Sequence, residues 1–345
     1  MQLKRIRLRD YMQVNAGILN YLNRLKYGQS EVFRTPFWNK APMPGVVKEW
    51  MKIVQNSDLN SKMPGLLEVE LEQSKKVGPF SVIPPSAKRM DTLKEYWEPV
   101  DGDAPINQEA VSMVKKLFKT LRPYNREQVI SEMRLNTIAG APYYVKRSEA
   151  LQIYEHINWE QDYPFIAIWG TRVQPGGPSV NDEKVRSVFM MPFLLNVLEG
   201  RYYYPLIAYE QKHELPFAVN DLRWTEQRVT RLFDTKGNDL VINTDFSSFD
   251  QTFRRPMQDA AHDILTAAFP ESERSAIAKT FWHKYTIPLL VSEDQAIFGP
   301  HGMGSGSTGT NPDENLGHKA LQYEAALEQG QELNPNSLCL GDDGI

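Results

Sequence analysis

Apolar residues recur at the spacing of an α-helix in three segments of the chain. The first segment covers residues 107–120, and the second covers 257–268 and stops before Pro270. The third follows Asn311-Pro312-Asp313-Glu314, where an N-cap residue, a proline in the first turn and two acids are typical of a helix start. Gly330 is expected to end this third helix. The pattern therefore predicts three amphipathic helices, two of them in the last third of the chain.

Two short apolar runs near these helices favour strands. Leu240-Val241-Ile242 is β-rich and predicts a strand that ends at Asp245. The run 338–340 leads into Gly341-Asp342-Asp343, a sequence typical of a tight turn. The C-terminal third is thus predicted to be strand, helix, helix, glycine-rich loop, helix, strand and turn. Residues 1 to about 100 mix short apolar runs with prolines, which indicates an irregular segment with a few helices.

Composition limits the class of protein. The chain has 345 residues, 41% of them apolar, which is enough for two or three globular domains. Its single cysteine, Cys339, excludes an internal disulfide and favours a reducing compartment. No apolar run approaches the length of a membrane span, and polar residues follow the basic N-terminus where a signal peptide needs an apolar core. The net charge of −4 argues mildly against a protein that coats nucleic acid but allows an enzyme with a basic channel.

Three polar clusters accompany the predicted elements. They are residues 245–250, which begin and end with Asp, the glycine- and hydroxyl-rich segment 302–311, and Gly341-Asp342-Asp343. Each has an ordinary structural explanation, namely a helix-capping acid, a flexible linker and a hairpin turn. The linker explanation is weakened because a well-capped helix is predicted to follow at once. Glycines also permit close approach of a ligand, and the hydroxyls can donate to it.

The order of the clusters points to phosphate chemistry. If the two predicted strands are neighbours in one sheet, Asp245 and Asp342 meet at their ends. Two carboxylates from separate strands can hold Mg²⁺, which prefers oxygen ligands and also accepts phosphate. Two such ions can activate an attacking hydroxyl and neutralise a leaving phosphate.

The patterns Asp-x4-Asp (245–250), Ser-Gly-x3-Thr (305–310) and Gly-Asp-Asp (341–343) resemble the palm motifs of viral RNA-dependent RNA polymerases. The residues within these motifs look most like those of the polymerases of picobirnaviruses and related double-stranded RNA viruses. The resemblance covers roughly residues 137–345. The resemblance implies an α+β fold: a right-hand polymerase with fingers and an incomplete palm, an antiparallel sheet with packed helices, and no thumb. It also implies a nucleotidyltransferase that joins ribonucleoside triphosphates on an RNA template by a two-metal mechanism, for viral genome replication and transcription.

The resemblance divides the chain into an N-terminal extension and fingertips region (1–105), fingers (106–237) and a palm truncated after its third motif (238–345). We expect a fragment that does not polymerise alone, because the family's next palm motif usually supplies a Lys as general acid and a thumb closes the RNA channel. We also expect the strand before the Gly-Asp-Asp turn to lack its hairpin partner and to leave an exposed sheet edge.

The motifs imply roles by position. Asp245, Asp342 and Asp343 match the catalytic acids that hold two Mg²⁺ or Mn²⁺ ions. Asp250 matches the residue that senses the ribose 2′-hydroxyl, the group that distinguishes RNA from DNA.

The glycine-rich loop matches the part of the family that positions the ribose and template. Ser305, Gly306 and Thr310 occupy its motif positions. Many relatives carry Asn four positions after the threonine, but this chain has Glu314 there. The neighbouring Asn315 is therefore our candidate for that nucleotide contact, and Asn311 is read as the helix cap.

Two upstream stretches support the resemblance. Arg172, Lys184 and Arg186 resemble the basic fingers motif at the nucleotide entry tunnel, where guanidinium forks and an ammonium suit a triphosphate. Without the palm motifs, a solvated basic loop would be preferred. Thr137 and Gly140 resemble the Thr-x2-Gly motif of the template channel.

The implied partners are RNA template and product, ribonucleoside triphosphates and a viral capsid protein, and the implied location is the host-cell cytoplasm and the virion interior. One rival is a reverse transcriptase, where a bulky steric gate is expected in place of the polar Asp250. The other is a catalytically silent RNA-binding or scaffold protein, since fold alone never proves activity. Such a protein has no physical need for mutually repelling carboxylates.

Overall fold

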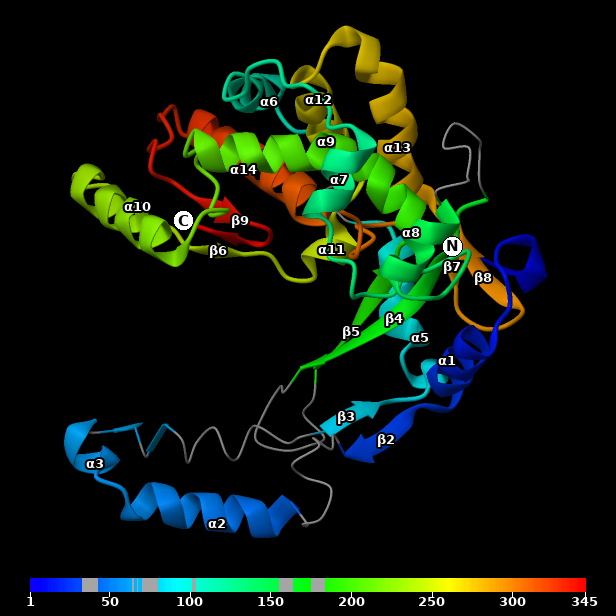
Figure 1. The fold of residues 1–345 in the computed structure, drawn as a ribbon. Coiled ribbons are helices and arrows are strands. Elements are labelled where there is room, and N and C mark those ends of the chain that lie inside the picture. The colour runs from blue at the N-terminus through cyan, green and yellow to red at the C-terminus, as the bar shows by residue number, and fades with distance from the viewer. Residues whose placement is uncertain are drawn as a thin grey trace. The chain divides into compact units, whose positions relative to one another are not determined.

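The structure is a computed structural model that describes residues 1–32, 43–63, 65–66, 68–69, 80–100, 104–154, 164–174 and 184–345 (Figure 1). The chain forms two compact units, each assembled from discontinuous pieces. The first unit consists of Met1–Leu19, Asp91–Trp169 and Phe189–Ile345, and the second of Asn20–Met90 and Gly170–Val188. The fold mixes helices and strands, as expected. The division into N-terminal extension, fingers and palm stays a prediction.

The helices within the described residues are α1 Ala16–Tyr27, α2 Met43–Asn56, α3 Leu59–Lys62, α5 Met90–Lys94, α6 Gln108–Lys115, α7 Arg126–Glu132, α8 Arg147–Tyr154, α9 Phe193–Lys212, α10 Leu222–Thr235, α11 Phe249–Thr252, α12 Arg255–Ala267, α13 Arg274–Thr286 and α14 Thr310–Glu328. Short 3₁₀ turns are η1 Leu8–Asp10, η3 Ser86–Lys88, η4 Glu95–Trp97 and η6 Glu271–Glu273. None of these helices is long and apolar enough to cross a membrane.

The strands of the described residues are β1 Gln2–Arg5, β2 Gln29–Val32, β3 Phe80–Ile83, β4 Ala167–Gln174, β5 Lys184–Met190, β6 Thr244–Asp245, β7 Leu289–Leu290, β8 Gln295–Phe298, β9 Cys339–Leu340 and β10 Asp343–Gly344. They form a five-stranded sheet of order β1-β8-β7-β4-β5, a three-stranded sheet of order β6-β10-β9, and the β2-β3 pair.

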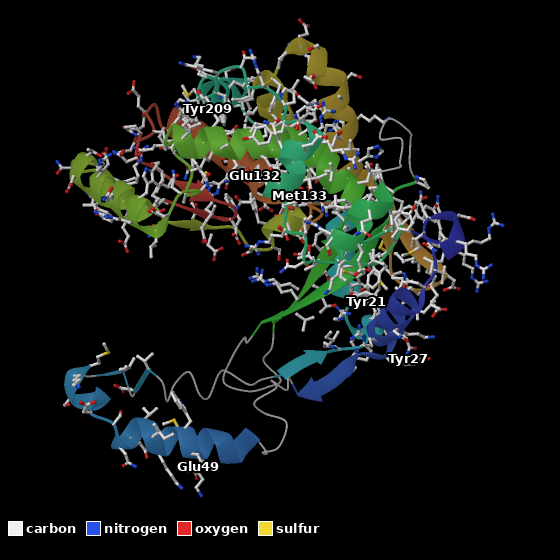
Figure 2. All side chains as sticks on the ribbon, viewed as in Figure 1. Tyr21, Tyr27, Glu49, Glu132, Met133 and Tyr209 are labelled. Atoms are coloured by element: carbon white, nitrogen blue, oxygen red, sulfur yellow. The ribbon has the colours of Figure 1, made fainter. Side chains whose placement is uncertain are left out.

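Two buried apolar clusters of described residues lie in the first unit. The larger one joins six helices through Val111 of α6, Tyr203 of α9, Phe249 of α11, Ile264 of α12, Phe281 of α13 and Leu316 of α14. The smaller one joins α7, α8 and α9. Figure 2 labels Tyr209, which packs against the larger cluster, and Met133, which belongs to the smaller one. Burial of these apolar faces is the main force that holds the helices together.

The helix predictions are confirmed, with shifted ends. The helix expected over 107–120 is α6, which is capped by Asn107 and ends at Lys115. The helix expected over 257–268 is α12. Gly330, with φ +62°, follows the end of α14 as expected.

The expected N-cap of α14 is wrong. The helix begins at Thr310 with Gly309 as its N-cap, so Asn311 already lies inside the first turn. The Asn311 side chain instead accepts a hydrogen bond from the Asn315 amide at 3.1 Å. The chain turns into the helix earlier because Thr310 Oγ1 donates to the carbonyl of Ser307.

The predicted strand over 240–245 is much shorter in the structure. Only Thr244 and Asp245 form β6, while Leu240 is 88% exposed and Ile242 is 69% exposed. Strand propensity needs a partner strand, and β6 has only the two residues of β10 to pair with. The expectation that β9 lacks a hairpin partner is also wrong, because β10 returns and pairs with it.

The β7–β8 hairpin was missed in the sequence. β8 pairs with β7 on one side and with the N-terminal strand β1 on the other, both antiparallel. β1 therefore closes one edge of the five-stranded sheet, although the side chains of β1 are exposed. Without buried apolar residues to mark it, β1 gave no periodic signal.

The second unit contains the antiparallel β2–β3 pair and residues 20–27 of α1, with Tyr21 and Tyr27 labelled in Figure 2. Arg89 is buried there and donates to the Thr171 hydroxyl at 2.7 Å and to the Pro84 carbonyl at 3.0 Å. Burial raises the pKa of Tyr21 to about 12, although the nearby Arg89 opposes the shift.

Candidate functional site

Two of the predicted acids face each other across the three-stranded sheet. Asp343 of β10 is the register partner of Asp245 on β6, and both residues are exposed. Directly opposed residues on antiparallel strands lie on the same face, where like charges repel. The two predicted strands lie in one sheet but are not neighbours, because β10 lies between β6 and β9, and Asp343 rather than Asp342 is directly opposite Asp245. This pair needs a cation or solvent to relieve its repulsion.

Asp342 lies in the turn between β9 and β10. The turn has two residues, Gly341 and Asp342, and Gly341 has φ +59°, a conformation that favours glycine. The carbonyl of Asp342 accepts from the Phe246 amide at 3.3 Å, which ties the turn to the residue after β6. The three acids Asp245, Asp342 and Asp343 therefore lie in one three-stranded sheet, on β6 and on the β9–β10 hairpin.

Helix α14 fixes this turn from beside it. The Asn315 side-chain oxygen accepts from the Gly341 amide at 2.8 Å. His318 Nδ1 lies 2.8 Å from the Gly341 carbonyl, and its Nε2 lies 3.2 Å from the Thr244 hydroxyl. Figure 1 shows β6 and β9 in one sheet, in which β10 lies between them. The buried side chains of Asn315 and His318 thus connect the strand residues next to the acids to α14.

Asp250 lies at the start of α11, after a strained residue. Ser248 adopts φ +54°, uncommon for a residue other than glycine and often a sign of a functional site. The carbonyl of Asp250 accepts from the Met303 amide at 2.7 Å, so the Asp250 segment and the glycine-rich loop are joined by backbone.

Glu314 is an acid of the site that the sequence did not single out as functional. Its side chain is buried, makes a hydrogen bond with Asp250 and faces the charge of Asp342. Burial first, and then Asp250, raise the pKa of Glu314 to about 10, so its carboxyl is neutral at physiological pH. Within the part of the chain that the structure describes, Glu314 Oε1 is buried without a hydrogen-bond partner. A buried unpaired oxygen beside three acids suits a polar ligand.

The glycine-rich loop is packed, which rules out the linker explanation. A side chain at Gly309 would come within 2.4 Å of the ring of Tyr203 and of Lys284 Nζ. The loop residue Ser305 accepts at its carbonyl from the Phe189 amide, and its hydroxyl is buried with no partner among the described residues. A second unpaired polar atom therefore lies in the predicted nucleotide-binding loop.

The remaining loop positions are also defined. Gly306 is exposed, and Thr310 is half-buried with its hydroxyl turned to the loop. Asn315 is fully buried, with both amide atoms used by Gly341 and Asn311. The predicted nucleotide contact of Asn315 stays a prediction, and these two hydrogen bonds compete with it.

The upstream predicted residues lie elsewhere in the chain's two units. Thr137 and Gly140 belong to the first unit, where the Thr137 carbonyl accepts from the Arg147 amide. Arg172 and Arg186 are exposed on β4 and β5 of the second unit, and the side chain of Lys184 lies outside the described residues. Their roles stay predictions.

A polar stripe on α14 is the sequence feature that could have identified Glu314 and His318 as site residues. Asn311, Glu314, Asn315 and His318 follow helical spacing, and three of these four are buried. Polar residues at core-facing positions of a helix need partners. Such a stripe beside the Gly-Asp-Asp turn points to a built site, and reading only the apolar positions of this helix overlooked it.

The donor set fits hard divalent ions in its chemistry. Asp245, Asp342 and Asp343 supply only carboxylate oxygens, which Mg²⁺ prefers. No group of three or more His, Cys, Asp or Glu in the described ranges is already arranged to hold a metal ion.

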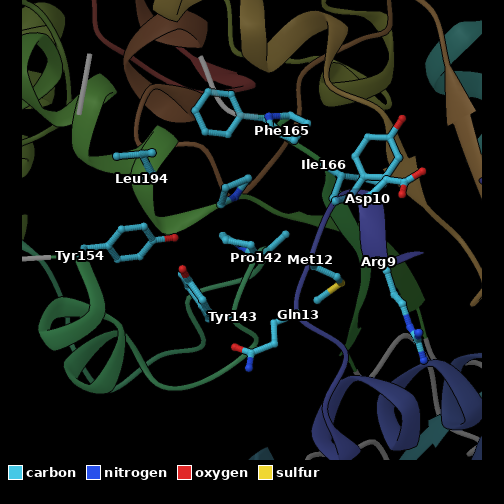
Figure 3. A pocket seen from close by; sticks show the side chains of 14 residues that line it. Arg9, Asp10, Met12, Gln13, Pro142, Tyr143, Tyr154, Phe165, Ile166 and Leu194 are labelled. Carbon is cyan, nitrogen blue, oxygen red and sulfur yellow. The ribbon is translucent and has the colours of Figure 1, made fainter. Parts of the chain in front are cut away.

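One cavity in the first unit is not lined by any of the predicted acids. It has a volume of about 340 Å³ and lies beside the N-terminal segment (Figure 3). Tyr143, Tyr154 and Phe165 line it, with Arg9 and Asp10 contributed by the N-terminal segment. None of the predicted site residues lines it.

Comparisons with known proteins agree with one another. The family model described as viral RNA-dependent RNA polymerase matches residues 88–345. The chain is 36% identical to a potential RNA-dependent RNA polymerase of Human picobirnavirus (strain Human/Thailand/Hy005102/-), over 96% of this chain and 65% of that protein. It therefore spans about two thirds of the length of that curated relative.

Two crystal structures are similar in fold. One is the RNA-dependent RNA polymerase of a human picobirnavirus, with TM-score 0.81, 35% identity and coverage of 98% of this chain and 68% of that one. The other is an insertion loop deletion mutant of the RNA-dependent RNA polymerase of a human picobirnavirus, with TM-score 0.82, 35% identity and coverage of 98% and 70%.

Proposed function

Because the chain belongs to the family of viral RNA-dependent RNA polymerases, we propose that it carries the nucleotidyl-transfer site of such an enzyme. The reaction joins ribonucleoside triphosphates on an RNA template and serves viral genome replication and transcription. The observation that carries this proposal is the facing pair Asp245 and Asp343, with Asp342 on the adjoining turn.

The three acids are the proposed ligands of two divalent ions, Mg²⁺ or Mn²⁺. When bound, such ions activate the attacking 3′-hydroxyl and neutralise the leaving pyrophosphate. The contribution of the chain itself is position, because Asn315 and His318 hold the turn that carries Asp342. The repulsion between Asp245 and Asp343 supports a cation between them.

Ribose selection is assigned to Asp250, supported by Glu314. Glu314, as a neutral acid, donates to the Asp250 carboxylate and leaves that carboxylate able to accept from a 2′-hydroxyl. Ser305, Gly306 and Thr310 form the nearby loop that would position the sugar. The unpaired Ser305 hydroxyl is a ready hydrogen-bonding group.

The triphosphate would be held by cations from the fingers motif, Arg172, Lys184 and Arg186, and the template would pass Thr137 and Gly140. RNA, nucleoside triphosphates and a capsid protein are the proposed partners, in the host-cell cytoplasm and in the virion. A right-hand arrangement with fingers and palm is proposed on the same grounds.

The test is incorporation of labelled nucleotides on a single-stranded RNA template, by a polypeptide extended to the relatives' full length. The parent should incorporate ribonucleotides and strongly prefer them to deoxyribonucleotides. The variant Asp342→Asn should lose synthesis by a factor of at least about 10³, because it removes a charge that the transition state needs. Its fold should be intact, because Asp342 is partly exposed and its bond to Phe246 uses the backbone.

A matched control is Asp259→Asn on α12, an exposed acid paired with Arg255 at 2.9 Å. This change should leave incorporation within about twofold, as surface ion pairs contribute little. Near-normal synthesis by the Asp342→Asn variant would refute the metal assignment. Preference for deoxyribonucleotides would favour a reverse transcriptase, and no incorporation in Mg²⁺ or Mn²⁺ by a folded parent would favour a silent RNA-binding protein.

A further inference from the structure

A fully buried carboxylate on a helix distant in sequence accepts hydrogen bonds from the glycine-rich loop. Glu199 lies on α9, with 0% of its surface exposed. Its Oε1 accepts from the Ser307 hydroxyl at 2.8 Å, and its Oε2 accepts from the Thr308 amide at 2.9 Å. The Ser307 hydroxyl in turn accepts from the Gly309 amide at 2.9 Å. Three consecutive loop residues therefore depend on one side chain 108 positions away in sequence from the first of them.

The same stretch of α9 secures the loop by further contacts. The Asn196 carbonyl accepts from the Thr308 hydroxyl at 3.2 Å. The Asn196 amide, in the orientation that satisfies both of its atoms, donates to Glu199 Oε2 at 3.3 Å and accepts from Arg147 at 2.7 Å. Glu199 thus receives donors from both the loop and its own helix.

The helix after the loop is anchored to the same region by a buried ion pair. Asp313 in the first turn of α14 accepts from Tyr203 of α9 at 2.7 Å and from Tyr285 of α13 at 2.8 Å. Lys284 Nζ lies 2.5 Å from Asp313 Oδ2, and neither side chain has any exposed surface. The loop is therefore clamped at Ser307–Gly309 by Glu199 and at the start of α14 by Asp313.

Burying a carboxylate is costly unless hydrogen bonds replace its water. Burial raises the pKa of Glu199, while Lys284 and the two loop hydrogen bonds oppose that rise. The bonds from Ser307 and Thr308 exist only when the loop keeps this one backbone conformation. The buried charge therefore penalises any loop conformation that releases it.

We propose that Glu199 is a positioning residue that holds the Ser307–Gly309 backbone in one conformation and so presents Ser305 and Thr310 to the nucleotide. The effect of Glu199 on nucleotide binding rests on the proposed function. Its effect on the loop conformation concerns this chain alone and can be tested without polymerisation.

Helix α9 offers a matched control. Glu210 is also fully buried on α9, but neither of its carboxylate oxygens has a hydrogen-bond partner among the described residues. Glu199→Gln and Glu210→Gln therefore make the same chemical change in the same helix at equal burial. Only the first change removes an acceptor from the loop, because glutamine keeps one carbonyl oxygen and its NH₂ cannot accept from whichever of the two loop donors it faces.

The decisive measurement is amide hydrogen exchange of the 345-residue chain at pH 6.5, read on peptides that cover 302–312. Glu199→Gln should speed exchange in that segment at least tenfold, and Glu210→Gln should leave it within twofold of the parent. Peptides from α12 report changes in global stability, so loop exchange in each variant is compared with exchange in α12, which separates a loop effect from a global one. Unchanged exchange in the loop of Glu199→Gln, or an equal effect of both variants, would overturn the proposal.

A second variant covers the case in which Glu199→Gln does not fold. Ser307→Ala keeps the backbone and removes the hydroxyl that joins Glu199 to Gly309. It should speed loop exchange at least threefold. If both single variants fold, the double variant should exchange less than the product of the two effects predicts, because the two groups act through one contact. Strictly multiplicative effects would contradict a shared contact.

The kinetic readout uses the polypeptide of full length. Glu199→Gln should raise KM for ribonucleoside triphosphates about tenfold and change kcat less than threefold, because a loosened loop weakens ground-state and transition-state binding alike. Glu210→Gln should change neither parameter more than twofold. Unchanged KM in a variant whose loop exchanges faster would overturn the proposed effect of Glu199 on nucleotide binding. An inactive parent would refute the proposed function, while the exchange measurement would still decide whether Glu199 holds the loop.

Discussion

At the scale of the single residue, Glu314 concentrates the energetics of the site. A carboxyl that is only 6% exposed, beside Asp250 and Asp342, is too costly to ionise. It is instead neutral and acts as a hydrogen-bond donor to Asp250. The resemblance described in the sequence analysis predicts Asn at this position, and Asn is also a neutral donor. Neutral Glu314 can therefore keep the hydrogen-bonding role expected of that Asn.

Glu314→Ala should weaken ribose selection. Loss of one hydrogen bond to a charged group is worth about 1.5–3 kcal/mol, so preference for ribonucleotides over deoxyribonucleotides should fall roughly ten- to a hundredfold. Glu314→Gln keeps a neutral donor of the same length and should stay within about threefold of the parent. The ratio of incorporation rates for the two nucleotide types is the measurement. An equal loss in both variants would show that a negative charge, rather than a donor, is needed there.

At the scale of the element, α14 is a scaffold for the β9–β10 hairpin. Its side chains supply partners to backbone groups of the hairpin strand and turn: Asn315 and His318 at Gly341, Lys319 at Ser337, and Gln322 at Leu338. Two-residue strands have few ladder bonds of their own, and isolated hairpins are marginal in water. The position of the proposed metal-binding acids therefore depends on one helix face.

Asn315→Ala tests this dependence through stability. The change leaves the buried Gly341 amide without its acceptor, and an unsatisfied buried donor costs about 1–3 kcal/mol. Urea unfolding should report a loss of that size in the free energy of unfolding. Glu328→Ala, an exposed change in the last turn of the same helix, should lie within about 0.5 kcal/mol of the parent. A loss below about 0.5 kcal/mol for Asn315→Ala would mean that water accepts from the Gly341 amide in place of the Asn315 side chain.

At the scale of the whole molecule, Glu210 couples stability to pH. Burial alone raises the pKa of Glu210 from 4.5 to about 8. The folded chain thus keeps a proton that the unfolded chain loses between these two values. Stability from this group is fully present below pH 4.5, falls by about 1.4 kcal/mol per pH unit above it, and stops falling near pH 8.

Glu210→Gln should remove this dependence. The variant should gain on the parent as pH rises from 5 to 8 and should be the more stable protein at pH 8. Urea unfolding at pH 5, 6.5 and 8 measures the difference between the two proteins, and their other ionisable groups cancel. A difference that does not change over this range would mean that Glu210 reaches solvent or a partner when it ionises.

Much of the local structure could be predicted because it depends on neighbours in sequence. Apolar spacing located α6, α12 and α14, and the acids at 245, 342 and 343 were found from the motifs. The prediction over 240–245 failed because a strand exists only where a partner strand reaches it. The Asn311 cap failed because Gly309 is the N-cap and the helix begins two residues earlier than expected, at Thr310.

By itself the sequence determined the family, the helices with apolar faces and the identity of the acids, since these follow from residue type and short spacing. Only the tertiary structure decided which acid faces which, that Glu314 meets Asp250, and that Glu199 reaches a loop more than one hundred residues away. The physical reason is that a buried polar group is stable only with its partner, and the chain brings these partners together only when the helices pack.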